Sequence, residues 1–147
     1  MHRADRRNEP VSLLLLDVDH FKHFNDSFGH AAGYQILCYL GEVLRHNTRG
    51  ADIVARYGGE EFAVLLPGTG TPEATRCADN LRQMASRMSI AWEGRVLPQL
   101  TVSVGVSACP DDGRELNALI NAADGALYRA KHSGRNRVFT VQQALTV

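Results

Sequence analysis

The chain has 147 residues, and its 16 Lys and Arg side chains balance 16 Asp and Glu side chains. This length suits one domain with a substantial hydrophobic core and is too short for two. A net charge near zero argues against a protein that coats nucleic acid, which would favour a basic domain. Local clusters of cations can still bind phosphate groups. We therefore expect residues 1–147 to form a single soluble globular domain.

Three cysteines, Cys38, Cys77 and Cys109, are widely spaced and odd in number. They lack the spacing of metal-binding cysteines and indicate free thiols in a reducing compartment. No segment reaches the length of a membrane span, since the apolar run from Leu13 to Leu16 is short. We expect a cytoplasmic location, either of a free protein or of the cytoplasmic part of a membrane-anchored one.

Residues 1–10 are polar and basic, and we expect them to be the tail of an upstream helix or a linker. Residues 11–18 predict the first strand, in which four consecutive leucines indicate burial on both faces. Asp17 and Asp19 follow on one face, by the strand period of two. A carboxylate at the end of a buried strand is costly unless it is paired or metal-bound. The alternative is that Asp17 caps the next turn.

The remaining elements follow from apolar periodicity and from turn residues. A loop over residues 21–29 leads into a helix whose apolar side chains recur every three or four residues up to Leu44. Apolar runs flank Gly58 and Gly59, which predicts a tight hairpin. The later elements are a helix from Thr71, a small hairpin at residues 90–97, a strand at 100–106, a helix ending at Gly134 and a strand at 137–141.

This order of elements places hairpins among crossover connections. It predicts an α/β fold of the α+β sandwich type, with a central mixed, largely antiparallel sheet of about five strands. Helices flank the sheet, and a small peripheral hairpin is added. In such a fold, strand ends and hairpin tips gather acidic groups from distant parts of the sequence.

Glu60 and Glu61 directly follow the two glycines of the first hairpin. A bound divalent cation would relieve their mutual repulsion, whereas the alternative is a solvated acidic turn. If the first strand lies beside this hairpin, Asp17 converges with them. Hard oxygen ligands with open positions suit Mg²⁺ or Mn²⁺ that bridges substrate phosphates.

Cations that can hold phosphate stand near these carboxylates or in the last helix. Lys22 follows Asp17 closely, and Lys131 and Arg135 come at the end of the final helix. Carboxylates, a metal ion and basic phosphate ligands together indicate nucleotidyl transfer, in which positioning and charge neutralisation supply most of the catalysis.

Five stretches that span nearly the whole chain resemble the motifs of one known family and follow one another in the same order as in that family. They are DVDHFKHFND at residues 17–26, GHAAG at 29–33, RYGGEEF at 56–62, LTVSVGV at 100–106 and AADGALYRAKHSGRNRV at 122–138. Together they resemble the catalytic domain of the GGDEF family, the diguanylate cyclases, whose fold is of the nucleotidyl-cyclase, palm-like type. Gly-Gly-Glu-Glu-Phe is one of the two common active forms of the family's defining turn.

The resemblance implies that two GTP molecules condense to cyclic di-GMP, a bacterial second messenger, with release of two pyrophosphates. One GTP would bind to each of two facing protomers of a homodimer, and the 3′-hydroxyl of one would attack the α-phosphate of the other. The family's usual opening motif, Asp-x-Leu-Thr-Gly-Leu-x-Asn-Arg-Arg, does not occur before Val11. We therefore expect the output domain of a longer signalling protein with an upstream sensory domain.

Carried over by position, the resemblance implies two Mg²⁺ or Mn²⁺ ions per active site, held by Asp17, the backbone carbonyl of Val18 and Glu60. Glu60 would also help to deprotonate the 3′-hydroxyl, and Glu61 would complete the metal shell. The implied phosphate ligands are Lys22, Lys131, Arg135 and the amides around Phe21, and the implied nucleoside contacts are Asn25 and His30. Without side chains, Gly58 and Gly59 let a nucleotide lie close to the backbone. Taken alone, His30 would be an ordinary surface or core histidine.

Tyr34 departs from the family pattern. The family's helix usually reads Gly-His-x-x-Gly-Asp, and that Asp pairs with the guanine edge. A phenol offers one hydroxyl where a carboxylate offers two acceptor oxygens, and losing a bidentate base contact costs on the order of 1–3 kcal/mol of discrimination. Ring stacking can offset part of this cost. We expect Tyr34 to alter guanine selectivity and GTP affinity.

Arg49 and Asp52 stand just upstream of the turn, where the family's Arg-x-x-Asp site binds the product as an inhibitor. Arg can engage guanine or phosphate, and Asp accepts guanine N–H groups, although such a string also occurs by chance. The alternative function is a catalytically weak or inactive module that binds cyclic di-GMP or GTP. A nucleotidyl-transfer palm of another kind is disfavoured by the near-zero charge and by the matching stretches.

Overall fold

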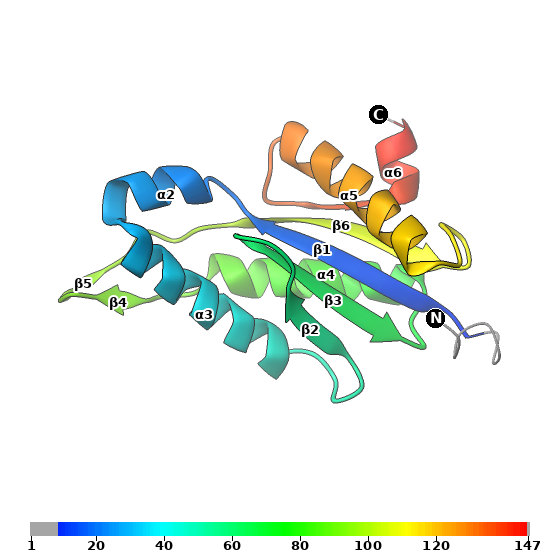
Figure 1. Ribbon diagram of the computed structural model, residues 1–147, viewed down its shortest axis with the longest axis horizontal. Coiled ribbons are helices and arrows are strands. Elements are labelled where there is room, and N and C mark those ends of the chain that lie inside the picture. Colours follow the sequence, from blue (N-terminus) through cyan, green and yellow to red (C-terminus); the bar gives the residue numbers. More distant parts are fainter. Residues whose placement is uncertain (1–8, 147) are drawn as a thin grey trace.

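The structure is a computed structural model that describes residues 9–146. Residues 1–8, the larger part of the expected N-terminal tail, lie outside the described residues. The elements are, in chain order, β1 (Val11–Val18), α2 (Phe21–Phe28), α3 (His30–His46), β2 (Ile53–Arg56), β3 (Glu61–Pro67), α4 (Thr71–Ser86), β4 (Ala91–Trp92), β5 (Arg95–Val96), β6 (Val102–Cys109), α5 (Leu116–His132), β7 (Val138–Thr140) and α6 (Val141–Thr146). Figure 1 shows their arrangement.

A five-stranded sheet in the order β2-β3-β1-β6-β7 forms the centre of the fold. β1 pairs antiparallel with both β3 and β6, β2 pairs antiparallel with β3, and β7 pairs parallel with β6. β4 and β5 form a separate two-stranded hairpin. The predicted α+β sandwich, with its mixed sheet and peripheral hairpin, is therefore confirmed.

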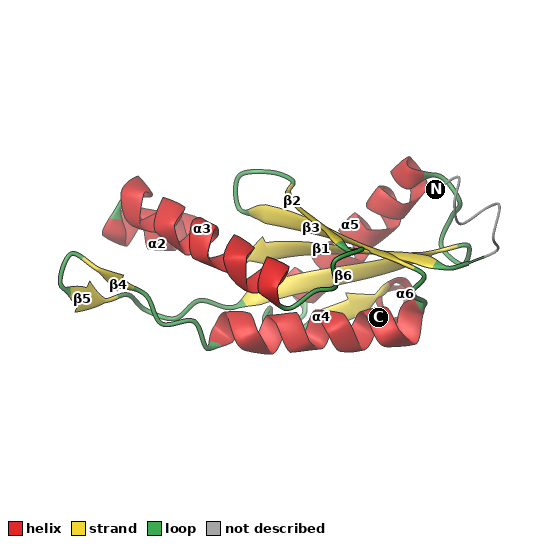
Figure 2. Cartoon of the chain, turned by 90° about the horizontal axis from the view of Figure 1, so that it is seen from below, coloured by secondary structure: helices red, strands yellow, loops and turns green. Residues whose placement is uncertain are grey.

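The central strand β1 is buried on both faces, as its run of leucines predicts. Leu14 and Leu16 pack with residues of α2, α3 and α4, whereas Leu13 and Leu15 pack with residues of α5. The same division is visible in Figure 2, where α3 and α4 lie on one side of the sheet and α5 on the other. Each leucine that is removed from water in this way contributes about 1.5–3 kcal/mol.

Three predicted boundaries are wrong. The strand expected at 137–141 is the shorter β7, and the helix α6, which was not expected, follows it directly. Residues 21–29 were expected as a loop, but most of them form the helix α2, because Phe21 and Phe24 point into the core and the rings of Phe24 and Phe28 stack. Gly29, with φ at 93°, separates α2 from α3. The strand expected at 100–106 is β6, which starts later and continues to Cys109. Its Gly105 is a point of close approach, since a Cβ there would collide with the α5 backbone.

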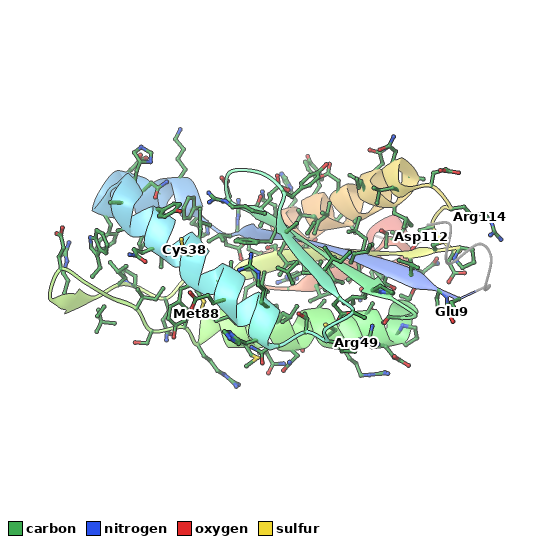
Figure 3. All side chains as sticks on the ribbon, turned by 60° about the horizontal axis from the view of Figure 1, so that its bottom comes forward. Glu9, Cys38, Arg49, Met88, Asp112 and Arg114 are labelled. Atoms are coloured by element: carbon green, nitrogen blue, oxygen red, sulfur yellow. The ribbon has the colours of Figure 1, made fainter. Side chains whose placement is uncertain are left out.

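The end of β1, the β2–β3 turn, α2, the start of α3 and the end of α5 gather at one end of the sheet (Figure 1). The segment that carries Arg49 enters β2 from the opposite end (Figure 3). Within residues 9–146, none of the helices has the length and apolarity needed to cross a bilayer. Cys38 and Cys77 are free thiols, and Cys38 is exposed.

Candidate functional site

The end of β1 and the turn between β2 and β3 form the acidic part of the site. β1 lies beside β3, so that Asp17 faces Glu61 across the two strands. The Val18 amide donates a hydrogen bond of 3.2 Å to the Glu60 carbonyl, which ties the turn to the strand end. Asp17, Glu60 and Glu61, which are far apart in sequence, are therefore neighbours.

The turn itself is closed by backbone hydrogen bonds. The amides of Tyr57 and Gly58 donate to the Glu61 carbonyl at 2.8 and 3.3 Å. Arg56 adds a side-chain bond, because its Nη2 donates to the Gly59 carbonyl at 2.8 Å. These contacts fix the positions of the two glutamates relative to β1 without engaging their carboxylates.

Burial and repulsion raise the pKa values of Asp17 and Glu61. Asp17 is 6 % exposed, and burial is the main cause of its raised pKa, with Glu60 and Asp19 adding repulsion and Lys131 opposing it. The pKa of Glu61 is also raised, first by burial and then by the charge of Asp17. This cluster of carboxylates therefore favours any added positive charge.

Two predicted phosphate ligands lie at the end of α5 (Lys131) and in the turn directly after it (Arg135), and Lys131 reaches the acidic end. Lys131 Nζ lies 3.1 Å from Asp17 Oδ2. Arg135 follows the helix in a left-handed conformation, with φ at 62°, and its amide donates to the Ala130 carbonyl at 3.1 Å. Lys131 thus pairs with a predicted metal ligand, and Arg135 lies in the turn directly after α5.

The oxygen atoms at the acidic end are suited to one kind of divalent-cation site. Among residues 9–146, no three His, Cys, Asp or Glu side chains converge closely enough to form a metal cage of their own. Mg²⁺ is usually bound by one or two carboxylates and completes its shell with water and substrate phosphates. Asp17, Glu60 and the Val18 carbonyl fit this second pattern, which leaves open positions for a substrate.

A pocket of about 550 Å³ opens between α2, the start of α3 and the β2–β3 turn. This volume is in the range of small-molecule sites. The predicted site residues that line it are Phe21, Lys22, Asn25, His30, Tyr34, Gly59 and Glu60. Glu60 therefore belongs both to the pocket and to the acidic cluster. The predicted site residues outside the lining are Asp17, Val18, Gly58, Glu61, Lys131 and Arg135.

Asn25 carries an unsatisfied polar atom in this pocket. Its Oδ1 is buried, and no hydrogen-bond partner lies near it in the described part of the chain. Such an acceptor is costly to bury. Gly33 of α3 makes room for the amide, since a Cβ at that position would collide with Asn25. The arrangement therefore buries an acceptor against α3 without a partner among residues 9–146.

Arg56 is a pocket residue to which the sequence analysis gave no role. Its guanidinium lies 6.0 Å from the centroid of the Tyr34 ring, and the same side chain bonds to Gly59. Tyr34 is 59 % exposed at the pocket edge, and a cation at this distance from its ring contributes about 0.5–1 kcal/mol. The position of Arg56 directly before the turn was visible in the sequence, but its packing against α3 was not.

Arg49 and Asp52 form a bonded pair at the other end of β2, away from the acidic turn. The Arg49 backbone amide and Nη2 each lie 2.8 Å from an Asp52 carboxylate oxygen. Nη2 also donates to the Pro67 carbonyl at 2.8 Å and to Thr69 Oγ1 at 3.0 Å. The two residues line a pocket of about 430 Å³, to which Cys77 also contributes. The structure therefore brings the predicted pair together as a bonded unit.

The family model described as diguanylate cyclase, GGDEF domain, matches residues 1–137. The chain belongs to the GGDEF family. Diguanylate cyclase A of Treponema denticola is 38% identical over 138 residues, which cover 94% of this chain and 37% of that protein. The chain thus spans little more than a third of this relative's length.

Solved GGDEF domains have the same fold. The GGDEF domain of DgcB from Caulobacter crescentus, in complex with c-di-GMP, matches with a TM-score of 0.89 at 32% identity, over 96% of this chain and 83% of that one. The active GGEEF domain of a diguanylate cyclase from Vibrio cholerae matches with a TM-score of 0.87 at 31% identity, over 97% and 89% of the two chains. The Vibrio cholerae domain is named for the same Gly-Gly-Glu-Glu-Phe sequence that this chain has at residues 58–62.

Proposed function

We propose that this GGDEF domain is a diguanylate cyclase, which condenses two GTP molecules to cyclic di-GMP and two pyrophosphates across a homodimer. One observation carries the proposal. Glu60 lines the 550 Å³ pocket and also stands in the carboxylate cluster with Asp17 and Glu61. A nucleotide in the pocket would therefore have its phosphates beside the groups suited to a divalent cation.

Asp17, the Val18 carbonyl, Glu60 and Glu61 would hold two Mg²⁺ or Mn²⁺ ions. Bound there, the metal supplies charge neutralisation at the phosphates and a lowered pKa of the attacking hydroxyl. The raised pKa values of Asp17 and Glu61 support this assignment, because a cation would remove the repulsion that contributes to them.

The chain's own residues would orient the substrate and move the proton. Glu60 accepts the proton of the 3′-hydroxyl, and Lys22, Lys131, Arg135 and the amides near Phe21 bind the phosphates. Lys131, which is paired with Asp17, would move to the triphosphate. This move would leave the Asp17 carboxylate available to a cation. The Lys131 ammonium would thereby exchange a carboxylate partner for a phosphate partner and would stay paired with an anion.

The nucleoside would occupy the pocket and contact its walls. Asn25, His30 and Tyr34 line this space and would contact the guanine ring and the ribose. Gly58 and Gly59 leave the turn without side chains, so that the nucleotide can approach the backbone.

Product inhibition is assigned to the second pocket. Arg49 and Asp52 would bind cyclic di-GMP there, with Arg49 facing guanine or phosphate and Asp52 accepting guanine N–H groups. The pair is already bonded to itself, so the ligand must share or replace these contacts. A second function, a module that binds cyclic di-GMP or GTP without turnover, is favoured by Tyr34, whose exposed ring stands where a carboxylate would read guanine.

We place the domain in the cytoplasm, as the output of a longer protein with an upstream sensory domain. The free thiols of Cys38 and Cys77 fit a reducing compartment. The greater length of Diguanylate cyclase A is consistent with further domains.

A turnover assay tests the proposal. The purified domain, at a concentration high enough for dimerisation, is incubated with GTP and Mg²⁺ or Mn²⁺, and cyclic di-GMP is measured by chromatography. We expect product formation, and a loss of about 10³-fold or more in Glu60→Ala, because the variant lacks both a cation ligand and the base. The exposed Glu115, at the far end of α5, provides the control Glu115→Ala. A dimer that yields no product with either metal would refute the cyclase and leave the binding module.

A further inference from the structure

Asp19 is a buried carboxylate that the proposed mechanism does not use. It is 2 % exposed and stands directly after β1, two residues beyond Asp17. Its Oδ1 accepts from Ser103 Oγ at 2.7 Å, and its Oδ2 accepts from Thr101 Oγ1 at 2.6 Å and from the Asn136 amide at 3.0 Å. A carboxylate is retained in such a place only when donors satisfy it. These donors come from two segments remote in sequence.

One of these segments is the turn after α5, whose backbone is held in an unfavourable conformation. Arg135 and Asn136 follow one another with φ values of 62° and 47°, a left-handed region that L residues with side chains rarely occupy. Surrounding contacts must therefore hold the turn. Besides the Asp19 bond, the Arg135 amide bonds to Ala130 and the Asn136 side chain accepts from Arg82.

The Asp19 bond differs from the other contacts of the turn, which include a bond from Arg137 Nε to the Arg135 carbonyl, because it ties the turn to the end of β1. The Arg135 amide bond ties the turn back to α5, and the Arg82 bond ties it to α4. Asp19 is adjacent to Val18 and stands two residues after Asp17, and these two residues are the assigned cation ligands. Asp19 thus joins the strand end that carries the cation ligands directly to the turn that carries Arg135.

We propose that Asp19 is a positioning residue, which holds the turn of Arg135 in register with the cation ligands on β1 so that both can act on one triphosphate. This inference rests on the proposed function, in which Arg135 binds phosphate. Without Asp19 the turn loses its bond to β1, and Arg135 must be ordered when the nucleotide binds. The ordering cost then appears as weaker phosphate binding.

The proposal predicts an effect confined to phosphate binding. In Asp19→Ala, we expect the non-cyclisable analogue GMPCPP with Mg²⁺ to bind about tenfold more weakly, in the range seen when a group that orients a ligand is removed. Guanosine, which lacks phosphates, should bind as it does to the wild type. Calorimetry measures both affinities. In the double variant with Arg135→Ala, the loss of Asp19 should cost nothing further, because Asp19 acts through Arg135.

Asp19→Asn tests whether geometry or charge is responsible. The amide oxygen can accept from Thr101 and Asn136, while the Ser103 hydroxyl can rotate to accept from the amide nitrogen. A positioning role therefore predicts GMPCPP affinity within about threefold of the wild type. An Asn variant as weak as Asp19→Ala overturns the proposal, since the charge would then be what matters.

Asp112→Ala is the matched control, because Asp112 also accepts a backbone hydrogen bond, from the Ala108 amide at 2.9 Å. It lies near the start of α5 and far from α2, at the opposite end of the molecule (Figure 3). Asp112→Ala should lower stability without changing GMPCPP affinity. If it weakens GMPCPP as much as Asp19→Ala does, the effect is one of general stability and the proposal fails.

The remaining outcomes separate this inference from the proposed function. Unchanged GMPCPP binding in Arg135→Ala refutes the phosphate role of Arg135 itself, and the positioning role falls with it. Weaker binding in Arg135→Ala, with Asp19→Ala unchanged or additive, overturns only the role of Asp19. If Asp19→Ala does not fold, Asp19→Ser replaces it, since its hydroxyl leaves room for a water but is too short to hold the turn. The same outcomes then apply to Asp19→Ser.

Discussion

The two ends of β2 carry acidic residues in opposite electrostatic situations. Before the strand, the Asp52 side chain is 3% exposed and is bonded to Arg49 through the backbone amide and the guanidinium. After the strand, Glu60 and Glu61 meet Asp17, and burial and repulsion raise the pKa values of Asp17 and Glu61. At the first end, the charge of Asp52 is neutralised by Arg49. At the second end, several carboxylates lie close together and repel one another.

This difference indicates what each end can bind. At the turn, a cation relieves repulsion that is already present, so its binding is favoured by the fold itself. At the Arg49 end, a ligand must replace or share hydrogen bonds that the pair already makes, and only the surplus appears as affinity. The first arrangement suits a resident cation with its substrate, and the second suits a ligand that is rich in complementary polar groups.

Removing a carboxylate from the turn end should have the largest effect. Asp17→Asn should lower turnover by about 10³-fold or more through loss of a cation ligand. Without nucleotide, Mn²⁺ at about 100 times its Kd should stabilise the wild type by about 2.7 kcal/mol. Thermal unfolding should show little stabilisation of Asp17→Asn by the same Mn²⁺ concentration. The exposed Asp111 gives the control Asp111→Asn, and equal stabilisation of Asp17→Asn would place the cation elsewhere.

Breaking the ion pair at the other end should have the next largest effect. Arg49→Ala removes the guanidinium that would bind guanine or phosphate of the ligand, and truncating one partner of a hydrogen-bonded charge pair between protein and ligand costs about 2–5 kcal/mol of binding. We therefore expect cyclic di-GMP to bind at least about 30-fold more weakly by calorimetry, with the initial turnover rate unchanged. Arg76→Ala, an exposed arginine on α4, is the control. Unchanged cyclic di-GMP binding in Arg49→Ala would remove this site.

Tyr34 lies at the edge of the turn-end pocket and should have a moderate effect. Tyr34→Asp should raise GTP affinity, and its preference over ATP, by about tenfold, because a carboxylate can accept two guanine N–H bonds. Tyr34→Phe keeps the ring beside Arg56 and separates the role of the hydroxyl from that of the ring. Equal nucleotide affinities of Tyr34→Asp and the wild type would mean that guanine is recognised elsewhere.

The smallest expected effect concerns stability and pH. The folded-state pKa of Glu61 is raised above its ordinary value of 4.5, so the charged form disfavours folding, and its contribution to stability falls as the pH rises through the raised pKa. Without divalent cations, Glu61→Gln should therefore raise the Tm by about 2 °C at pH 7.5. This gain should shrink as the pH falls to 4.5 and below. A gain that is the same at pH 4 and pH 7.5 would contradict the repulsion at the turn.

Much of the fold was predictable from local patterns. The four leucines of β1, the hairpin at the paired glycines and the helical periodicity from Gly33 to Leu44 are local signals, and the structure confirms them. The hairpin forms without a positive φ at Gly58 or Gly59, which is the feature that made glycine a turn signal there. α2 was missed because the helix has only eight residues and most of them are polar. It is stabilised by the burial of Phe21 and Phe24 in the core. The sequence alone contains no measure of that burial.

The acidic turn and its family resemblance were readable in the chain itself, because glycines, carboxylates and their spacing are properties of consecutive residues. Tertiary structure alone decided the pairing of Lys131 with Asp17, the position of Arg56 beside Tyr34 and the contacts of Asp19. Asp19 accepts from donors 82, 84 and 117 residues away. Such bonds form only after sheet pairing and helix packing have brought the segments together, so local sequence determines which groups are present and the fold determines which of them meet.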